Sequence, residues 1–596
     1  MPRQNGYVPI RDYAALGDGR TVALVARDGS VDWLCVPDAD SGSVFGRILD
    51  ARRGGCFELQ PDQPFETERT YLDGSNVLTT TFRTADGAVR VTDAMTLGGP
   101  QLTPVRELAR SVEGLSGRVP MRWRVEPRFD FGRKRTTIGL RSGRPFAAAD
   151  RDALAVGAWD AGEPTLSTDA IEGRFDAESG SRALLNVAVT HQEPAVLPCR
   201  DDVEDRVRRT IEFWESWSAR VRYDGRWRDE VVRGALALKL CVFSPSGAIV
   251  AAPTTSLPEW IGGNRNWDYR FTWLRDASFT TDALLRLGFD DEAHSFFWWF
   301  MHASRLTQPR LQILYRVNGG YQATEGELPH LDGYRSSKPV RVGNGAAKQV
   351  QLDVYGDVLD SVWLYVESGK SLDKATAKEV AKIADYVTEI WRDADSGIWE
   401  MRSDPTHFVH SKAMCWVALD RACRLAARGA IPDRRERWRR AADEIREFVD
   451  SRGFDPEKNS YVRAPDRREL DASLLTLSLF EYRDPRDERL VGTIEAVKRE
   501  LAEGPLVYRY RSDDGVGGRE GCFLTCSFWL VDALARAGRV DEATRDMETL
   551  LTYANDVGLY AEEIRPDDGA FLGNFPQALV HLALVNAAVS LMDAAR

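Results

Sequence analysis

Two loop segments carry glutamates that could act as an acid and a base. Glu400 follows Trp399 in SGIWEMR, and Glu562 lies in GLYAEEIRP, each between stretches of helical periodicity. A carboxyl group beside an indole loses hydration, which raises its pKa and suits it to donate a proton. A second, ionised carboxylate could activate water, and a separation of roughly 6.5–9.5 Å would make the pair an inverting glycosidase site. Solvated or helix-capping glutamates are the alternative interpretation.

A third segment could bind the substrate of such a pair. The stretch NRNWDYRFTWLRDASFT, residues 264–280, mixes five aromatic residues, among them Trp267, Tyr269, Phe271 and Trp273, with arginines and aspartates and holds almost no aliphatic residues. Aromatic faces stack on the apolar faces of sugars, and arginine–carboxylate pairs form charge-assisted hydrogen bonds with hydroxyl groups. The composition alone fits equally well with a buried helix start whose ion pair is structural.

The composition limits the classes of function. A chain of 596 residues with 43 % hydrophobic and 29 % charged residues is typical of a globular protein with two or more domains. A net charge of -12 argues against nucleic acid as a partner. The start of the chain lacks the apolar region of a signal peptide, and no apolar run is long enough to span a membrane.

Cysteines and histidines give little sign of a metal site. The eight cysteines lie mostly in apolar runs, so we expect buried free thiols and a reducing cytoplasm. Cys522 and Cys526 have CxxxC spacing, but no second Cys or His pair lies near enough to complete a zinc site. His407 and His410 are expected to cap or pack. We therefore expect no metal ligands and no cofactor.

The first 200 residues predict a β domain. Short runs alternate in hydrophobicity or favour β-branched residues, and turn signals such as DG at 28–29, DG at 86–87 and SGR at 142–144 separate them. Many short strands with hairpin turns favour a β-sandwich. The predicted strands are Thr21–Arg27, Ser30–Cys35, Asn76–Arg83, Val89–Met95, Val119–Pro127 and Leu184–Thr190.

The remainder predicts a helical domain. Residues 201–225 contain a linker helix, and from residue 226 to 596 apolar residues recur at helical spacing in twelve segments. Twelve helices are what a barrel of six helix pairs requires, although a solenoid or a bundle would give a similar number. The segments are 226–243, 276–288, 290–304, 354–368, 373–392, 409–427, 433–451, 468–481, 486–502, 521–537, 540–554 and 574–594.

Five long connections separate these helices. Loops longer than about 15 residues in a compact domain are usually functional. If alternate connections of a barrel gather at one end, these five would form one pocket that brings Glu400 and Glu562 together. The connections are 251–275, 305–353, 393–408, 503–520 and 555–573.

Taken together, four segments resemble glycoside hydrolase family 15, the glucoamylase and trehalase family. IRDYAALGDGRTVALVARDGSVDWLCVPDADSGSVFGRILD is similar to the trehalase-like N-terminal domain of bacterial and archaeal members, and NWDYRFTWLRDASF is similar to the first sugar-binding loop of the family. GIWEMR resembles the segment with the general acid, and YAEEIRPDDGAFLGNFPQA resembles the segment with the general base. The four follow the family's order along nearly the whole chain.

The resemblance implies a fold, a reaction and roles for residues. It implies a β-supersandwich followed by an (α/α)6 barrel, and an exo-acting α-glucoside hydrolase that inverts configuration and releases β-glucose. Glu400 would be the general acid and Glu562 the general base. Arg275 and Asp276 would bind hydroxyls of the non-reducing glucose, in a subsite that further residues would line. Those residues are Tyr269, Trp273 and Trp399.

One departure concerns the leaving sugar. Fungal glucoamylases carry a second glutamate after the Trp-Glu pair, where this chain has Met401. Segment 326–357 resembles the trehalase and bacterial α-glucosidase branch instead, so trehalose, isomaltose-type substrates and short α-glucans all remain open. Candidates for contact with the leaving sugar are Arg341, Asn344, Gln349 and Glu520, and a structural role is an alternative for each.

Other functions on the same fold remain as alternatives. A lyase or phosphorylase would use a different set of acids and bases, and a sugar-binding protein would be expected to lack one of the two glutamates. Mycobacterial-type trehalases are associated with phosphate and magnesium dependence, which the sequence leaves open. We expect a small carbohydrate as the ligand, with no nucleic acid or membrane partner, and the sequence leaves the oligomeric state open.

Overall fold

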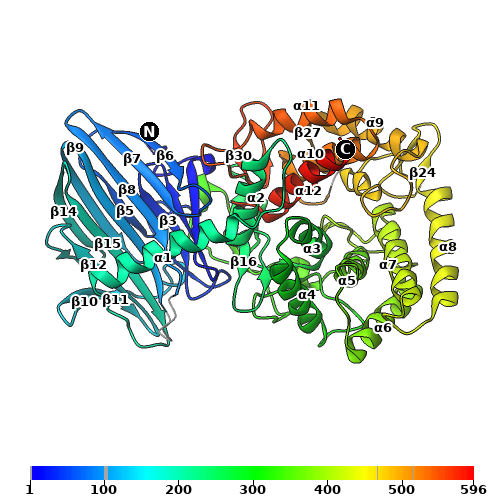
Figure 1. Cartoon of the computed structure of the whole chain (residues 1–596), viewed down its shortest axis with the longest axis horizontal. Coiled ribbons are helices and arrows are strands. Elements are labelled where there is room, and N and C mark those ends of the chain that lie inside the picture. The colour runs from blue at the N-terminus through cyan, green and yellow to red at the C-terminus, as the bar shows by residue number, and fades with distance from the viewer. Residues whose placement is uncertain (1–2, 99–104, 466, 513, 596) are drawn as a thin grey trace.

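The N-terminal part of the chain is one large antiparallel sheet. The computed structural model describes residues 3–98, 105–465, 467–512 and 514–595, and Figure 1 shows the sheet on one side of the molecule and the helices on the other. The sheet has fifteen strands. They are β1 (Tyr13–Gly17), β2 (Val22–Ala26), β3 (Ser30–Cys35), β4 (Ser43–Phe45), β5 (Cys56–Pro61), β6 (Glu66–Tyr71), β7 (Leu78–Thr84), β8 (Gly87–Met95), β9 (Arg106–Glu126), β10 (Thr137–Arg141), β11 (Arg144–Ala149), β12 (Asp152–Trp159), β13 (Thr165–Leu166), β14 (Ile171–Glu178) and β15 (Arg182–His191).

The long strand β9 joins the two halves of this sheet. Its first half pairs with β8 and β15, and its second half pairs with β5 and β14. The turn signals seen in the sequence lie at the hairpins: Ser142 and Gly143 both have positive φ, which the tight turn between β10 and β11 requires. The prediction of a β region is confirmed, although the predicted strand at residues 119–127 is only the end of a strand of 21 residues.

The rest of the described chain is mainly helical. Helix α1 (Arg200–Ser218) runs from the sheet toward the helical part. The helices that follow match the predicted segments closely. They are α2 (Arg228–Cys241), α3 (Ala277–Arg286), α4 (Asp290–Ser304), α5 (Val354–Glu367), α6 (Lys374–Ile390), α7 (Val409–Ala427), α8 (Arg435–Arg452), α9 (Glu488–Leu501), α10 (Leu524–Arg536), α11 (Val540–Leu551) and α12 (Ala578–Ala594).

One predicted helix is wrong. The segment 468–481 forms only the short 3-10 helix η5 (Ala472–Leu477). Asp471 caps it by accepting the N–H of Ser473 at 2.8 Å, and the hydroxyl of Thr476 donates to the carbonyl of Ser473 at 2.7 Å. Such side-chain bonds offer the backbone partners other than those of an α-helix. Glu481 then has a positive φ of 58°, which ends any helical continuation.

Six elements close a ring in the helical part. α3 packs on α5, α5 on α7, α7 on η5, η5 on α10, α10 on α12, and α12 on α3. The helices α2, α4, α6, α8, α9 and α11 lie outside this ring, each against an inner element, whereas α1 packs on β8 and α2. Burial follows the arrangement: every residue of the inner helix α12 from Ala578 to Leu591 is buried, whereas the outer helix α11 buries only a stripe of three residues, which is the pattern of a surface helix.

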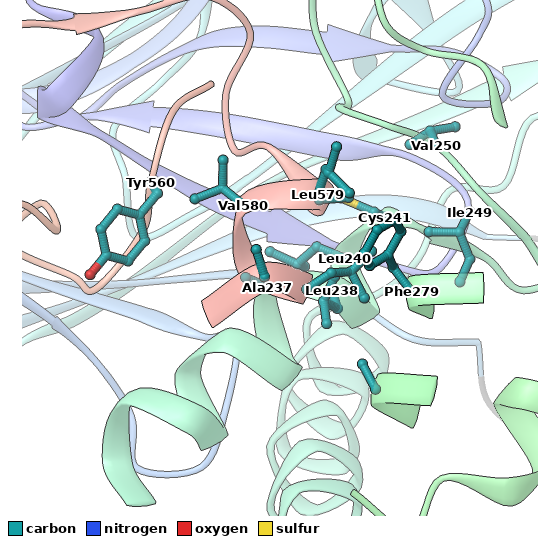
Figure 2. Packing of buried hydrophobic residues seen from close by; sticks show 14 of the residues in the cluster. Ala237, Leu238, Leu240, Cys241, Ile249, Val250, Phe279, Tyr560, Leu579 and Val580 are labelled. Atoms are coloured by element: carbon teal, nitrogen blue, oxygen red, sulfur yellow. The ribbon is translucent and has the colours of Figure 1, made fainter. Parts of the chain in front are cut away.

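The outer helix α2 shows how the two layers join. Its apolar residues Ala237 and Leu240 pack with Leu579 of α12 and Phe279 of α3 in one core (Figure 2). Burial of these side chains removes apolar surface from water, which stabilises the folded state by about 25 cal/mol for each Å2 of apolar area buried. Within the described ranges, no helix is long and apolar enough to cross a membrane.

The long connections all lead into inner elements. Segments 251–275, 305–353, 393–408, 503–520 and 555–573 precede α3, α5, α7, α10 and α12 in turn. They contain short strand pairs, so they are ordered structures with their own hydrogen bonds. The pairs near the site are β18 (Thr255–Pro258) with β19 (Asn266–Asp268), β20 (Thr272–Trp273) with β21 (Leu314–Tyr315), and β28 (Cys522–Phe523) with β29 (Glu563–Ile564) and β30 (Phe571–Leu572).

Candidate active site

Glu400 lies at the end of a tight turn and points toward two donors. Its backbone has a positive φ of 50°, which is uncommon outside glycine and is found at functional sites. The indole Nε1–H of Trp273 donates to its Oε1 at 3.0 Å, and Nη1 of Arg275 donates to the same oxygen at 2.9 Å. Burial raises the pKa of Glu400, and the nearby Arg275 cation opposes that rise.

Glu562 is more enclosed than Glu400. It is 1 % exposed. The hydroxyl of Tyr269 donates to its Oε1 at 2.7 Å, and the backbone N–H of Asn574 donates to its Oε2 at 3.3 Å. Burial raises the pKa of Glu562, while the Arg509 cation and the Tyr269 hydrogen bond act in the other direction. Gly573 leaves room for this carboxylate, since a Cβ there would lie 2.3 Å from Oε2.

The two glutamates are linked through a pair of aromatic rings. Trp273 bonds to Glu400 and Tyr269 bonds to Glu562, and the two rings meet edge to face with centroids 5.4 Å apart. Both rings belong to the segment that follows β19, and the backbone of Trp273 is fixed by the pairing of β20 with β21. The structure thus brings together two carboxyl groups that lie 162 positions apart in the sequence.

Arg275 and Asp276 form an ion pair beside the first glutamate. Nε of Arg275 donates to Asp276 at 2.8 Å, and Nη1 also donates to the carbonyl of Ile398 at 2.9 Å. These bonds fix the guanidinium at the start of α3. Both oxygens of the fully buried Asp353, which interacts electrostatically with Arg275, lack a hydrogen-bond partner among the described residues, and burial raises the pKa of that carboxyl to about 8.

A cavity opens next to Glu400 and Tyr269. Four of the five long connections line it, and the fifth reaches it through Glu562, which bonds to Tyr269. Trp399 forms part of its wall and is held by a bond from its Nε1 to Asp471 at 2.9 Å. The lining residues are Glu259, Arg265, Trp267, Tyr269, Asn344, Ala346, Gln349, Trp399, Glu400, Met401, Arg402, Arg509, Tyr510, Asp514, Val516 and Glu520.

The residues predicted for the leaving side fall into two groups. Asn344, Gln349 and Glu520 line the cavity, and Gln349 also donates to the carbonyl of Met401 at 3.0 Å. Arg341 is not among the lining residues; it lies over Trp267 at 4.6 Å and donates to the carbonyl of Asn264 at 2.8 Å. In this structure Arg341 therefore supports the indole of Trp267.

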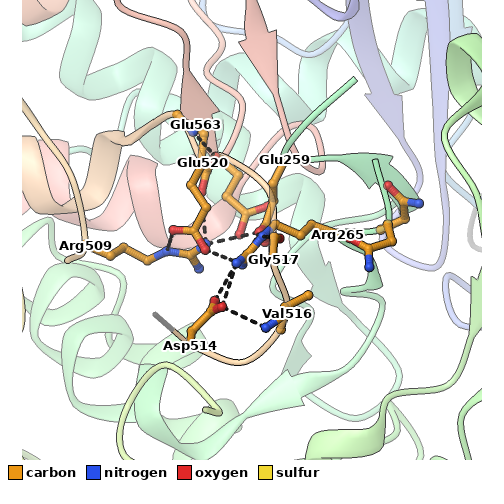
Figure 3. A network of polar contacts seen from close by, with 12 residues as sticks. Glu259, Arg265, Arg509, Asp514, Val516, Gly517, Glu520 and Glu563 are labelled. Atoms are coloured by element: carbon orange, nitrogen blue, oxygen red, sulfur yellow. Dashed lines mark hydrogen bonds and ion pairs between the residues drawn. The ribbon is translucent and has the colours of Figure 1, made fainter. Parts of the chain in front are cut away.

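Sequence reasoning missed a charged cluster on the cavity wall. Arg509 bonds to three carboxylates, those of Glu259 at 3.1 Å, Glu563 at 3.0 Å and Glu520 at 3.0–3.1 Å (Figure 3). Arg265, which gained no role from the sequence, bonds to Glu520 and to Asp514. One signal was present: Glu259 precedes Trp260, so it repeats the glutamate–indole adjacency that singled out Glu400.

The histidines and cysteines lie where a structural role predicts them. His410 is 4 % exposed, its Nε2 lies 3.2 Å from the hydroxyl of Thr476, and burial lowers its pKa to about 4. Cys522 and Cys526 are buried free thiols. Among the residues that the structure describes, no group of three or more His, Cys, Asp or Glu side chains is placed to hold a metal ion.

The arrangement supports acid–base chemistry. Glu400 has a raised pKa and two donors that stabilise its charge after it has given up a proton. Glu562 is held by one donor on each oxygen, and its partner Tyr269 lines the cavity together with Glu400. A bond between two substrate groups could be protonated by the first carboxyl and attacked by water that the second one activates.

Comparisons with known proteins give a consistent result. The model for "Glycosyl hydrolases family 15" matches residues 225–547 and 540–589, and the model for "Trehalase-like, N-terminal" matches residues 4–144. A trehalase of Mycobacterium tuberculosis is 39 % identical over 100 % of this chain and 91 % of its own length. A trehalase of Thermoplasma volcanium is 34 % identical over 99 % of this chain and 94 % of its own length.

A solved structure shares the fold. A bacterial glucoamylase complexed with acarbose superposes with a TM-score of 0.74 at 13 % identity, covering 99 % of this chain and 96 % of that chain. At this identity the likeness concerns the fold alone. It extends over both the sheet and the helical part.

Proposed function

The chain belongs to glycosyl hydrolase family 15 and is a glycoside hydrolase, and we propose that it hydrolyses the small α-glucoside trehalose with inversion of configuration. The observation that carries the proposal is the pairing of Glu400 and Glu562, each held by a donor from the same aromatic segment. The relatives that align over the whole chain are trehalases, which favours trehalose over maltose or isomaltose.

Glu400 acts as the general acid in this proposal. Its raised pKa keeps a proton on the carboxyl group until the glycosidic oxygen accepts it. When the proton leaves, the Nε1–H of Trp273 and the guanidinium of Arg275 stabilise the new carboxylate with hydrogen bonds to a charged group. The acid is therefore set up for the transition state, in which its charge develops.

Glu562 acts as the general base. The hydroxyl of Tyr269 and the backbone N–H of Asn574 each donate a hydrogen bond to one carboxylate oxygen of Glu562, and these two bonds fix the plane of the carboxylate. It removes a proton from water, which attacks the anomeric carbon from the face opposite the leaving oxygen. No covalent intermediate forms, and the attacked glucose leaves with β configuration.

The attacked glucose occupies the subsite next to the acid. Arg275 and Asp276 bind its hydroxyls, and the rings of Tyr269, Trp273 and Trp399 line it, in agreement with the resemblance. Both glucose units of trehalose are non-reducing, so the attacked glucose is a non-reducing end in either orientation of the substrate. Glu520 and Gln349, which line the cavity, are proposed to contact the leaving sugar.

The fold belongs to the same proposal. The closed ring of α3, α5, α7, η5, α10 and α12 with its outer helices is an (α/α)6 barrel, and the two halves joined by β9 form a β-supersandwich. The chain divides into a sandwich at 1–200, a linker helix at 201–225 and a catalytic barrel at 226–596. The likeness to a bacterial glucoamylase over both parts supports this division.

A substrate panel with two variants tests the function. Glucose release is measured from trehalose, maltose and isomaltose, and we expect trehalose to give the highest kcat/KM. Glu400→Gln and Glu562→Gln should each lower kcat by about 10²–10⁴-fold. Glu327→Gln, an exposed glutamate of the same end of the barrel, is the matched control. Near-normal turnover by either active-site variant would exclude that residue as the acid or the base.

A further inference from the structure

Glu259 is a buried carboxyl group with one oxygen that no described protein group satisfies. It follows β18, and its backbone N–H donates to the carbonyl of Arg265 at 3.0 Å. The side chain is 1 % exposed and belongs to the cavity wall. Its Oε2 accepts Nη2 of Arg509 at 3.1 Å, whereas its Oε1 is buried without a hydrogen-bond partner. An unpaired buried acceptor is costly, so either a proton or a ligand group is expected at this atom.

The surrounding charges favour a proton on this carboxyl group. Two guanidinium groups, those of Arg265 and Arg509, face four carboxyl groups (Figure 3). Two cations cannot balance four carboxylates, so the cluster has an excess of negative charge. The carboxylate of Glu562, which precedes Glu563 in the chain, adds to this excess. The four carboxyl groups are those of Glu259, Asp514, Glu520 and Glu563.

Glu259 is the member of the cluster with the fewest hydrogen-bond donors, and burial raises the pKa of its neighbour Glu563 in the same direction. Glu520 accepts from both guanidinium groups, Asp514 accepts from Arg265 at 2.7 Å and from Tyr510, and Glu563 also accepts the N–H of Gly521 at 2.8 Å. Among the side chains that the structure describes, only that of Arg509 donates a hydrogen bond to Glu259. Burial, followed by the nearby Glu562 and Glu520 charges, raises its pKa to about 8 against the opposing Arg509.

The location of Glu259 points to the leaving sugar. The cavity also holds Tyr269 and Trp399 of the attacked-glucose subsite, so it extends over both sides of Glu400. Glu259 shares Arg509 with Glu520, which the sequence selected for the leaving sugar, and both line the cavity wall. A neutral carboxyl group offers one O–H donor and one carbonyl acceptor, which suits the hydroxyls of a pyranose.

We propose that Glu259 is a specificity-determining residue of the leaving-sugar subsite, where its neutral carboxyl group contacts a pyranose hydroxyl. The proposal rests on the hydrolytic function proposed above. It makes binding of the leaving sugar depend on the proton of Glu259. When Glu259 ionises in alkaline solution, the donor is lost and a further negative charge faces Glu520, Glu562 and Glu563, so the KM for trehalose rises above about pH 8.

Two substrates separate this role from the chemistry. Trehalose has a leaving sugar, whereas α-glucosyl fluoride places the same glucose before the acid and has none. Glu259→Ala should lower kcat/KM for trehalose at least tenfold and change that for α-glucosyl fluoride less than about threefold. An equal loss with both substrates, or no loss with trehalose, would overturn the proposal. If the wild-type protein cleaves neither substrate, the hydrolytic function itself fails, which is a different result.

A neutral variant tests the protonation state. Glu259→Gln has nearly the same shape, carries a donor and an acceptor, and cannot ionise. We expect its KM for trehalose at pH 6 to stay within about threefold of the wild type and to lack the alkaline rise. A KM that rises more than tenfold at pH 6, or an alkaline rise that persists, would show that the neutral carboxyl is not the binding form. This variant keeps the test valid if Glu259→Ala does not fold.

Discussion

The hydrogen bond between Tyr269 and Glu562 makes a quantitative prediction about the pH dependence of activity. Replacing Tyr269 with Phe removes only the hydroxyl that donates to Oε1 of Glu562 at 2.7 Å. A hydrogen bond to a charged group contributes about 1.5–3 kcal/mol. Since one pKa unit corresponds to about 1.36 kcal/mol, the pKa of Glu562 should rise by roughly 1–2 units.

The direction in which the pH profile moves follows from the role of Glu562 as the base. Burial already raises the pKa of Glu562, and the Tyr269 bond opposes that rise by stabilising the carboxylate. A base must be ionised, so activity is lost as the pH falls through its pKa. In Tyr269→Phe the acidic limb of the profile of kcat/KM against pH should therefore move to higher pH by about one unit or more. The alkaline limb, which reports Glu400 as the acid, should move little.

The assay is kcat/KM for trehalose across the acidic range for three proteins. The third is Tyr560→Phe, a control that also removes one tyrosine hydroxyl: Tyr560 is buried, and its hydroxyl donates to the carbonyl of Leu550 at 3.3 Å and not to a glutamate. The control should keep the wild-type limb. If Tyr269→Phe folds with an unchanged melting temperature and an unchanged acidic limb, Glu562 is not the base that the profile reports.

Three further variants test the surroundings of the site. Gly573→Ala places a Cβ 2.3 Å from Oε2 of Glu562 at a φ of 73°, so kcat for trehalose should fall about 100-fold, and a loss below threefold would contradict the close approach. Arg270→Met leaves the buried carboxylate of Asp268 without its partner at 2.7–2.8 Å and should cost roughly 3–5 kcal/mol in urea unfolding; a cost below 1 kcal/mol would show that the pair is dispensable. Asp353 keeps its proton in the folded state up to about pH 8 and loses it near pH 4 when unfolded, so the free energy of unfolding falls as the pH rises across this window. Asp353→Asn should flatten that fall between pH 5 and 8, and an unchanged slope would contradict the buried neutral carboxyl.

Most helix positions were readable from the sequence because a helix that buries one face has apolar residues at helical spacing, as in the narrow stripe of α11. Helix α12 is buried on every face and is marked instead by a long, almost uninterrupted apolar stretch. The period failed at η5, where apolar residues are mixed with hydroxyl side chains that bond to the local backbone. Periodicity records which residues face the core, whereas these side-chain bonds determine whether the backbone continues as an α-helix.

The candidate site was likewise predictable only in part from the sequence. Glu400 and Glu562 could be selected by their neighbours in the chain, but the Tyr269–Glu562 bond joins residues 293 positions apart and is visible only in the folded chain. Arg341 was chosen from its segment, and the structure turns its guanidinium onto Trp267. The Arg509 cluster was missed because its members lie in three connections and acquire meaning only when four carboxyl groups face two cations.

Two charged residues of the sugar-binding stretch have a structural role. The guanidinium of Arg270 donates hydrogen bonds to Asp268, to the carbonyl of Ser41 and to Sγ of Cys35 in β3. Arg270 therefore connects the helical part to the sheet. Asp268 in turn accepts the N–H of Gly343 at 2.9 Å, in the segment that leads to the cavity residue Asn344. The sheet thereby supports the loops that form the cavity.

The anomers released first from trehalose test the central claim most directly. Proton NMR within the first turnovers, before mutarotation, distinguishes the two glucose units: water attacks one anomeric carbon, and the other keeps its bond to oxygen. Single displacement by Glu400 and Glu562 predicts equal amounts of β-glucose and α-glucose. Release of α-glucose alone would mean retention through a covalent intermediate and would contradict the assignment of Glu562 as a base.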